Sequence, residues 1–216
     1  YALRVEDAAG RAVHLNVFVL VPRSAIRDGQ LNGYRIGAYR VTAGQPHPRG
    51  FVEVAPDAED ILVSPHFTLG QLLCKQPGSP RYLVLSVPLV HKLEAVLAEV
   101  AARGHDVHTL HVMSAFRTPW YNRSIGNTTT LSRHLYGEAA DIFVDADGDG
   151  YMDDLNGDGR RDVADARLLS GWVEHVERAE RSGLPRIVLG GLKAYRRNQV
   201  RGPFVHVDVR GRAARW

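Results

Sequence analysis

SRHLYGEAADIFVD, residues 132–145, is the most informative stretch of the sequence, and it is best considered together with FVHVDVRG, residues 204–211. His134 and Asp141 lie seven residues apart across a glycine, while His206 lies in a distant segment with the pattern of a β-strand. Two imidazoles and one carboxylate suit a tetrahedral Zn²⁺ ion that keeps its fourth position for water. Because the chain contains ten histidines, spacing alone also fits a structural His–Asp pair without a metal.

Three motifs, in this order along the chain, resemble those of a known family. SAFRTPWYN, residues 114–122, resembles its S-[GA]-[FY]-R segment, and SRHLYGEAAD matches its signature S-x-H-x-x-G-x-A-x-D. FVHVDVRG resembles its closing histidine motif. The family is the zinc D-alanyl-D-alanine carboxypeptidase and hedgehog-like superfamily. The resemblance extends from about Ser64 to Trp216 and is nearest to the exported murein endopeptidases.

The resemblance implies that His134, Asp141 and His206 are zinc ligands. Zinc lowers the pKa of its bound water to about 7 and polarises a carbonyl group. Arg117 matches the arginine with which the family holds a substrate carboxylate or carbonyl, a bidentate task that suits a planar guanidinium. A surface ion pair is the alternative role for this arginine. Three further residues are expected to shape the cleft: Ser132, Tyr121 and Asn122.

The acid/base group is where the sequence departs from the family. Many relatives carry Glu or His two or three residues before the last zinc ligand, whereas this chain has Phe204 and Pro203. We expect Asp208 to replace that group, because residues 206 and 208 of a strand project from the same face. The alternative is that Asp208 orients His206 or the substrate arginine. Glu138 is a weaker candidate for the acid/base role.

DADGDGYMDDLNGDGRRDVADA, residues 145–166, is a second strong signal, because its spacing is typical of a calcium-binding loop of the EF-hand type. Two registers overlap, as in thrombospondin-type and dockerin modules. One consists of Asp145, Asp147, Asp149, Gly150, Asp153 and Asn156; the other consists of Asp154, Asn156, Asp158, Gly159, Asp162 and Asp165, with the backbone oxygen of Arg160. We expect at least one Ca²⁺ ion within residues 145–165, which would brace Asp141. The alternative is a solvated acidic loop.

The pattern of the remaining segments predicts an α+β fold with helices packed on a mostly antiparallel sheet, as in the hedgehog and D-Ala-D-Ala peptidases that the chain resembles. Residues 1–57 are expected to form a small N-terminal β region, and residues 58–216 the zinc peptidase-like domain. Strands are predicted at 17–21, 34–41, 51–54, 107–114, 187–191 and 203–209. Helices are predicted from Ser64, at 88–103 with Gly104 as the stop, and at about 165–182 with Gly183 as the stop.

Composition excludes several classes of protein. The 216 residues are 44% hydrophobic, which excludes disorder, and no apolar run is long enough for a membrane span. Nine aspartates and two arginines between residues 141 and 165 leave the rest of the chain strongly basic despite a net charge of +3. No aromatic–basic motif indicates a nucleic-acid partner, while an anionic membrane surface or acidic polymer stays open. The lone Cys74 is expected in the core, and the first residue is Tyr, which a removed export signal or trimmed end would explain.

These observations predict an exported, monomeric zinc peptidase, periplasmic or extracellular, that acts on peptidoglycan peptides as an endopeptidase or carboxypeptidase. A second hypothesis is a zinc- and calcium-bound recognition module without catalytic activity, since hedgehog-like relatives serve as recognition modules. A third, a calcium-dependent scaffold of the dockerin type, requires a duplicated pair of loop–helix units, and only one acidic stretch is present.

Overall fold

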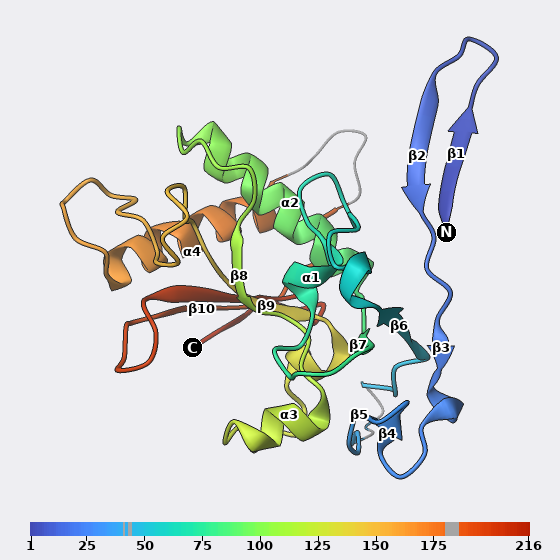
Figure 1. The fold of residues 1–216 in the computed structure, drawn as a ribbon. Coiled ribbons are helices and arrows are strands. Elements are labelled where there is room, and N and C mark those ends of the chain that lie inside the picture. The colour runs from blue at the N-terminus through green and yellow to red at the C-terminus, as the bar shows by residue number, and fades with distance from the viewer. Residues whose placement is uncertain (41, 43–44, 180–185) are drawn as a thin grey trace.

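A five-stranded sheet carries the residues of the three motifs (Figure 1). Its strand order is β12–β10–β11–β9–β8, and all neighbours pair antiparallel except β10 and β12. The strands are β8 (His111–Ser114), β9 (Ala139–Phe143), β10 (Gly191–Tyr195), β11 (Phe204–Asp208) and β12 (Ala214–Arg215). This computed structural model describes residues 1–40, 42, 45–179 and 186–216.

Two long helices pack beside one another against this sheet. Helix α4 (Val163–Arg178) contacts β10 and β11, and helix α2 (Val87–Ala102) contacts α4. Along the central strands β9 and β11, side chains that face the core alternate with side chains that face the opposite side of the sheet. Their apolar side chains are fully buried in the core: Ala140, Ile142, Val205 and Val207. Asp141 and His206 therefore project from the opposite face of the sheet.

The N-terminal β region shares the core of the rest of the chain. Strand β6 (Gly50–Val54) pairs with β3 (Val21–Pro22) on one side and with β7 (Arg81–Leu83) on the other. A small hairpin of β4 (Gln30–Leu31) and β5 (Tyr34–Arg35) supplies further buried side chains to the same core. The predicted division at residue 57 therefore does not coincide with a break in packing.

Among the described residues, the first hairpin stands away from this core. Strands β1 (Ala2–Glu6) and β2 (Ala12–Asn16) pair antiparallel, and every residue in them is exposed. Figure 1 shows them as a ribbon projecting from the body of the molecule. A two-stranded hairpin is marginal in isolation, so little of the stability of the chain resides here.

Several predicted boundaries are wrong for local reasons. Ser64 does not begin a helix; α1 (Leu69–Leu72) begins after Thr68, whose side chain forms a capping box with Gln71. Residues 107–110 and 187–190 precede their strands instead of belonging to them, and 17–20 form an extended connection. The predicted strand over 34–41 is confined to Tyr34–Arg35 among its described residues.

Helix α4 begins at Val163, two residues before the predicted start, because Asp162 caps it. Its predicted stop at Gly183 lies outside the described residues. The remaining short helices are η1 (Arg23–Ala25), η2 (Pro56–Ala58), α3 (Pro119–Ser124) and η3 (Arg133–Tyr136).

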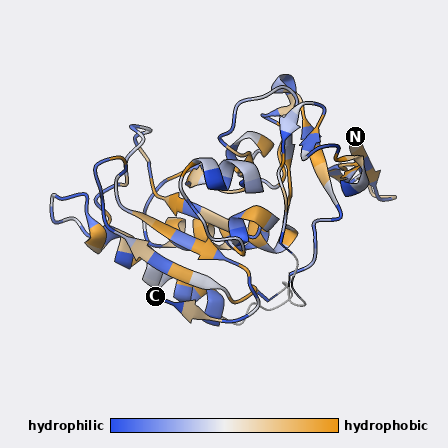
Figure 2. Ribbon diagram, turned by 90° about the horizontal axis from the view of Figure 1, so that it is seen from below, coloured by the Kyte–Doolittle hydropathy of each residue, from blue (hydrophilic) through white to orange (hydrophobic). Residues whose placement is uncertain are grey.

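The described chain is thus a mixed fold of four α-helices and largely antiparallel sheets, as the sequence predicted in outline. Figure 2 shows apolar residues concentrated along the central strands and polar residues along the loops. Within the described ranges, we find no helix of the length and hydropathy that crossing a membrane would require.

Candidate metal centre

Strand pairing brings together two candidate ligands that are 65 residues apart in sequence. Asp141 in β9 and His206 in β11 are register partners, and side chains of such a pair emerge side by side on one face. His206 Nδ1 lies 2.9 Å from Asp141 Oδ1. Both side chains are nearly buried, since Asp141 is 6% and His206 is 11% exposed.

A tight turn presents the third ligand. His134 lies in the 3₁₀ helix η3, which ends at Gly137 with φ of 65°. A Cβ atom at Gly137 would overlap the backbone carbonyl of Val84, so both the space and the left-handed conformation require glycine. This explains the glycine three residues after the histidine in the signature. His134 Nε2 lies 3.4 Å from Asp141 Oδ1.

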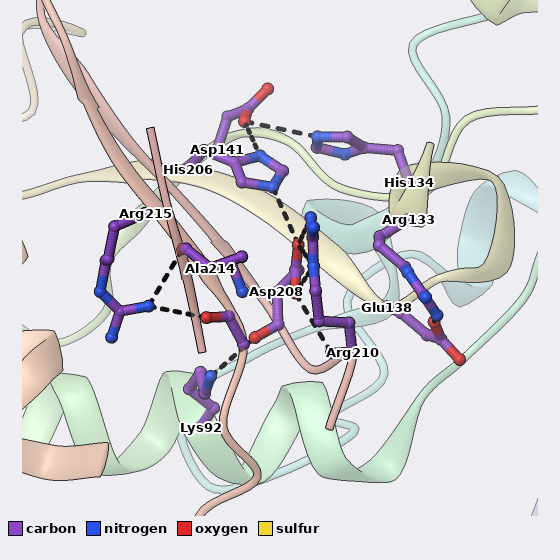
Figure 3. A network of polar contacts seen from close by, with 12 residues as sticks. Lys92, Arg133, His134, Glu138, Asp141, His206, Asp208, Arg210, Ala214 and Arg215 are labelled. Atoms are coloured by element: carbon purple, nitrogen blue, oxygen red, sulfur yellow. Dashed lines mark hydrogen bonds and ion pairs between the residues drawn. The ribbon is translucent and has the colours of Figure 1, made fainter. Parts of the chain in front are cut away.

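These separations fit a zinc ion. Bonds of about 2.0–2.1 Å at tetrahedral angles hold ligand atoms about 3.3 Å apart, and the two measured separations are 2.9 and 3.4 Å. His134 Nδ1 contacts the carbonyl oxygen of Ala115 at 2.7 Å, which leaves Nε2 as the metal-binding nitrogen. Figure 3 shows both imidazoles directed at the Asp141 carboxylate.

Electrostatics favour the protonation state that a metal needs at His134 and Asp141 and oppose it at His206. Burial lowers the pKa of His134 and keeps this imidazole neutral. Burial alone would raise the pKa of Asp141, but His134 and His206 hold it well below its usual range, so the carboxylate is ionised. Burial also opposes the charge of His206, but hydrogen bonds to Asp141 and Asp208 outweigh this effect and raise its pKa. A metal would displace the proton from this nitrogen.

Comparison with known proteins agrees with this geometry. A model of the family described as Peptidase M15 matches residues 65–152, a segment that holds His134 and Asp141. This match covers less than half of the chain, and it indicates the M15 superfamily of zinc D-Ala-D-Ala carboxypeptidases for that segment. No curated protein and no solved structure matched the chain. M15 peptidases are zinc-dependent. The third candidate ligand, His206, lies beyond the matched segment and joins the group by its position beside Asp141.

Arg117 contacts Asp141, one of the three candidate metal ligands. Its Nη2 donates to Asp141 Oδ2 at 2.7 Å and its Nε donates to Ser114 Oγ at 2.8 Å. The guanidinium is nearly buried at the wall of the cleft. Arg117 therefore fixes the orientation of the Asp141 carboxylate, and the surface ion pair considered for it is excluded by this burial. Its contact with substrate stays a prediction.

Asp208 lies behind His206 and not beside the metal position. Its fully buried carboxylate accepts the backbone N–H of Gly191 at 2.7 Å and forms an ion pair with Arg210. Asp208 Oδ2 lies 3.4 Å from His206 Nε2, the ring nitrogen opposite the metal-binding Nδ1 (Figure 3). Burial would raise the pKa of Asp208, but His206, Arg210 and the N–H of Gly191 hold it well below its usual range. These contacts argue against the acid/base role and favour orientation of His206.

The metal position opens into a cleft of about 420 Å³. Four arginines and one carboxylate, that of Asp141, belong to its lining: Arg117, Asn127, Thr129, Leu131, Ser132, Arg133, His134, Asp141, Tyr195, Arg201, Phe204, His206, Arg210 and Trp216. Ser132 lines the cleft as predicted. Asn122 acts indirectly, because its side-chain amide donates to the carbonyl oxygens of Asn127 and Thr129. Glu138 pairs with Arg133 and is not among the lining residues.

Sequence reasoning missed a buried polar network beneath the cleft. Lys92 of α2 is fully buried and donates to Glu177 Oε1 and to the backbone oxygen of Asp208, both at 2.7 Å. Glu177 also accepts from Arg215 of β12. Lys92 lies on the buried face of α2, which also carries Leu89, Leu93 and Val96. A lysine within such an apolar pattern is a signal in the sequence that could have indicated a buried ion pair.

The acidic loop follows β9, the strand that carries Asp141. Asp145, Asp147 and Asp149 each present a carboxylate oxygen, and the three oxygens lie within 4.8 Å of one another. The other predicted carboxylate ligands do not converge with them into such a group within the described chain: Asp153, Asp154, Asp158, Asp162 and Asp165. For the two remaining predicted ligands, Asn156 and the backbone oxygen of Arg160, calcium binding stays a prediction. Asp165 instead caps α4, accepting backbone N–H groups with both oxygens.

Proposed function

We propose that this chain is a zinc-dependent peptidase that hydrolyses amide bonds in the stem peptides or cross-links of peptidoglycan. The observation that carries the proposal is the convergence of His134, Asp141 and His206 at the wall of an open cleft. Bound zinc supplies Lewis-acid activation of a carbonyl group and of water. The hedgehog-like fold is part of the same proposal.

Some residues around the metal position orient its ligands, and others are available to bind the substrate. Arg117 and Asp208 each hold one ligand, Asp141 and His206 respectively, in the orientation that the ion needs. The arginines of the cleft lining outnumber its carboxylates four to one. A cleft of this charge favours an anionic substrate, and peptidoglycan stem peptides carry free carboxylates. Arg201 and Arg210 are placed on the lining to contact them.

Localisation and assembly follow from the substrate as part of the proposal. Peptidoglycan lies outside the cytoplasmic membrane, so we propose that the protein is exported and acts as a monomer in the periplasm or the extracellular space. Either environment supplies the peptide substrate without a nucleic-acid or membrane-embedded partner.

A second candidate function is zinc-dependent recognition without hydrolysis. One observation favours it: apart from the metal ligands, the described lining of the cleft holds no carboxylate or imidazole that can accept a proton. Phe204 and Pro203 occupy the positions where many relatives carry such a group. In this case, the arginines would bind the anionic peptide without cleaving it.

Release of amino groups from purified peptidoglycan by the zinc-loaded protein separates the two functions. We expect release by the wild type, loss with His134→Ala together with loss of bound zinc, and no change with His175→Ala, whose side chain is exposed. Zinc bound in a 1:1 ratio without amino-group release, and with retention on peptidoglycan, would overturn the peptidase proposal and support recognition.

A further inference from the structure

The start of the acidic loop contains a buried carboxylate with one unsatisfied oxygen. The Asp145 side chain is 6% exposed. Its Oδ2 accepts the backbone N–H of Gly150 at 3.1 Å and lies 3.1 Å from His111 Nδ1. Its Oδ1 is fully buried, and no hydrogen-bond partner for it exists among the described residues. Buried carboxylate oxygens normally have partners, because leaving one without a partner forfeits its hydration.

Two more carboxylates lie close to that of Asp145. One oxygen each of Asp145, Asp147 and Asp149 falls within a sphere in which no pair is more than 4.8 Å apart. Oxygens on opposite sides of a Ca²⁺ ion at 2.3–2.6 Å lie about 5 Å apart, so this spread fits one ion. Arg161 contacts the Oδ2 atoms of Asp147 and Asp149 from outside. Its single positive charge leaves the three carboxylates with a net negative charge, which a divalent ion would remove.

We propose that the loop binds one Ca²⁺ ion in the register that starts at Asp145, a site separate from the zinc centre. Asp145, Asp147 and Asp149 supply positions 1, 3 and 5, and Gly150, with φ of 81°, makes the bend at position 6. The backbone oxygen of Tyr151 stands at position 7. An all-oxygen set of ligands selects Ca²⁺ over Zn²⁺.

The aspartates of the other register do not form a converging group among the described residues, and its last carboxylate is already engaged. Position 12 there is Asp165, whose Oδ1 accepts the N–H groups of Leu155 and Asn156 and whose Oδ2 accepts that of Asp162. This carboxylate is fully buried and is engaged in ending the loop and beginning α4. The position that should close the coordination sphere is thus part of the helix cap.

The proposed site is coupled to β9 by short connections. Asp153 N donates to Val144 O at 3.0 Å, and Ala146 N donates to Asp153 Oδ2 at 2.8 Å, which closes the loop onto the end of the strand. Asp145 follows the zinc ligand Asp141 by four residues. Calcium would therefore order the segment that extends the zinc-binding strand.

Titration with CaCl₂ alone, followed by calorimetry on the full zinc-loaded chain, tests the proposal. We expect one Ca²⁺ per chain, with Kd in the range of about 10⁻⁵ to 10⁻³ M. Asp149→Ala should weaken binding at least about tenfold, whereas Asp158→Ala, at the same position of the other register, should leave it unchanged. Both side chains are exposed, so both variants are expected to fold. Terbium luminescence sensitised by Tyr151 provides a second readout, since its backbone oxygen is a proposed ligand.

Three outcomes would overturn the proposal. They are the absence of Ca²⁺ binding by the wild type at 10-fold the upper end of that range, equal loss of affinity in the two variants, and loss with Asp158→Ala alone. The last would assign the ion to the other register. Because binding is measured without substrate, failure of the peptidase proposal would not affect this result.

Discussion

Replacing Asp208 with asparagine tests how this residue acts. In the folded protein the carboxylate touches His206 Nε2 at 3.4 Å while it accepts the Gly191 N–H and pairs with Arg210. An asparagine amide keeps one oxygen, and its nitrogen then faces either the Nε2–H of His206, at the Oδ2 position, or the N–H of Gly191, at the Oδ1 position. Both are donors, so at least one contact is lost.

The expected effect is on zinc affinity. Removal of a group that orients a metal ligand costs about 10–100-fold in affinity or activity. Because the contact at 3.4 Å is near the long limit of a hydrogen bond, we expect the lower end, about tenfold or about 1.4 kcal/mol of binding free energy. Competition with a chromophoric chelator at pH 7.5 measures this change. Activity of Asp208→Asn should recover to within a few fold at saturating zinc.

The acid/base role makes the opposite prediction. Loss of a proton-transfer group lowers kcat by about 10²–10⁴-fold, and zinc affinity would stay unchanged. A lower kcat with unchanged zinc affinity would refute the orienting role, provided that a cooperative unfolding transition shows the variant to be folded. Asp165→Asn is the matched control, because Asp165 is also fully buried and accepts several backbone N–H groups. It should lower stability and leave zinc affinity unchanged.

Three further predictions concern stability. Lys92→Met removes one partner of an ion pair whose side chains are at most 1% exposed, and it should lower the free energy of unfolding by about 3–5 kcal/mol in urea titrations, although Glu177 keeps Arg215 as a partner. Burial raises the pKa of Cys74, so a thiol reagent at pH 8 should modify it only as fast as the chain unfolds; rapid labelling of the native protein would contradict this. Asp141 and Asp208 have folded pKa values well below their ordinary value of 3.8. Their contribution to the free energy of unfolding of the metal-free protein is fully present above pH 3.8. This contribution should decline as the pH falls below about 4, by up to about 1.4 kcal/mol per pH unit for each group.

The sequence could indicate the convergence of His134 and Asp141 because their spacing reflects local geometry. The glycine after His134 is required by a turn and by the carbonyl of Val84, so the sequence retains it as a fixed interval. The pairing of Asp141 with His206 spans 65 residues, and no local rule fixes that register. It was identified through the resemblance of the motifs.

The role of Asp208 shows where strand periodicity stops being informative. Residues 206 and 208 do project from one face, and their side chains do approach each other. The direction of the carboxylate, however, is set by the Gly191 N–H from β10 and by Arg210. The Gly191 contact comes from another strand and the Arg210 contact from beyond the end of β11, so the pattern predicted the face correctly and could not predict the contacts.

Lys92 illustrates the same limit in a helix. The spacing of Leu89, Leu93 and Val96 predicted an apolar stripe on α2, and all three are buried. Lys92 lies on that stripe as well, and its partner Glu177 is 85 residues away. Propensity places a lysine in solvent, and only the packing of α4 against α2 supplies the buried carboxylate that makes this position possible.

The two proposed ions differ in ligand chemistry, and this difference lets strand β9 and the loop that follows it bind different ions. The zinc position has two imidazoles and one carboxylate, all nearly buried, whereas the cluster at Asp145, Asp147 and Asp149 offers only oxygens. Calcium binds weakly to neutral imidazole, and zinc prefers nitrogen to an all-carboxylate set. A chelator selective for calcium should therefore empty the loop and leave the Asp141 site loaded. If the same treatment released zinc, the two positions would be one coupled centre, and the assignment of two independent sites would be wrong.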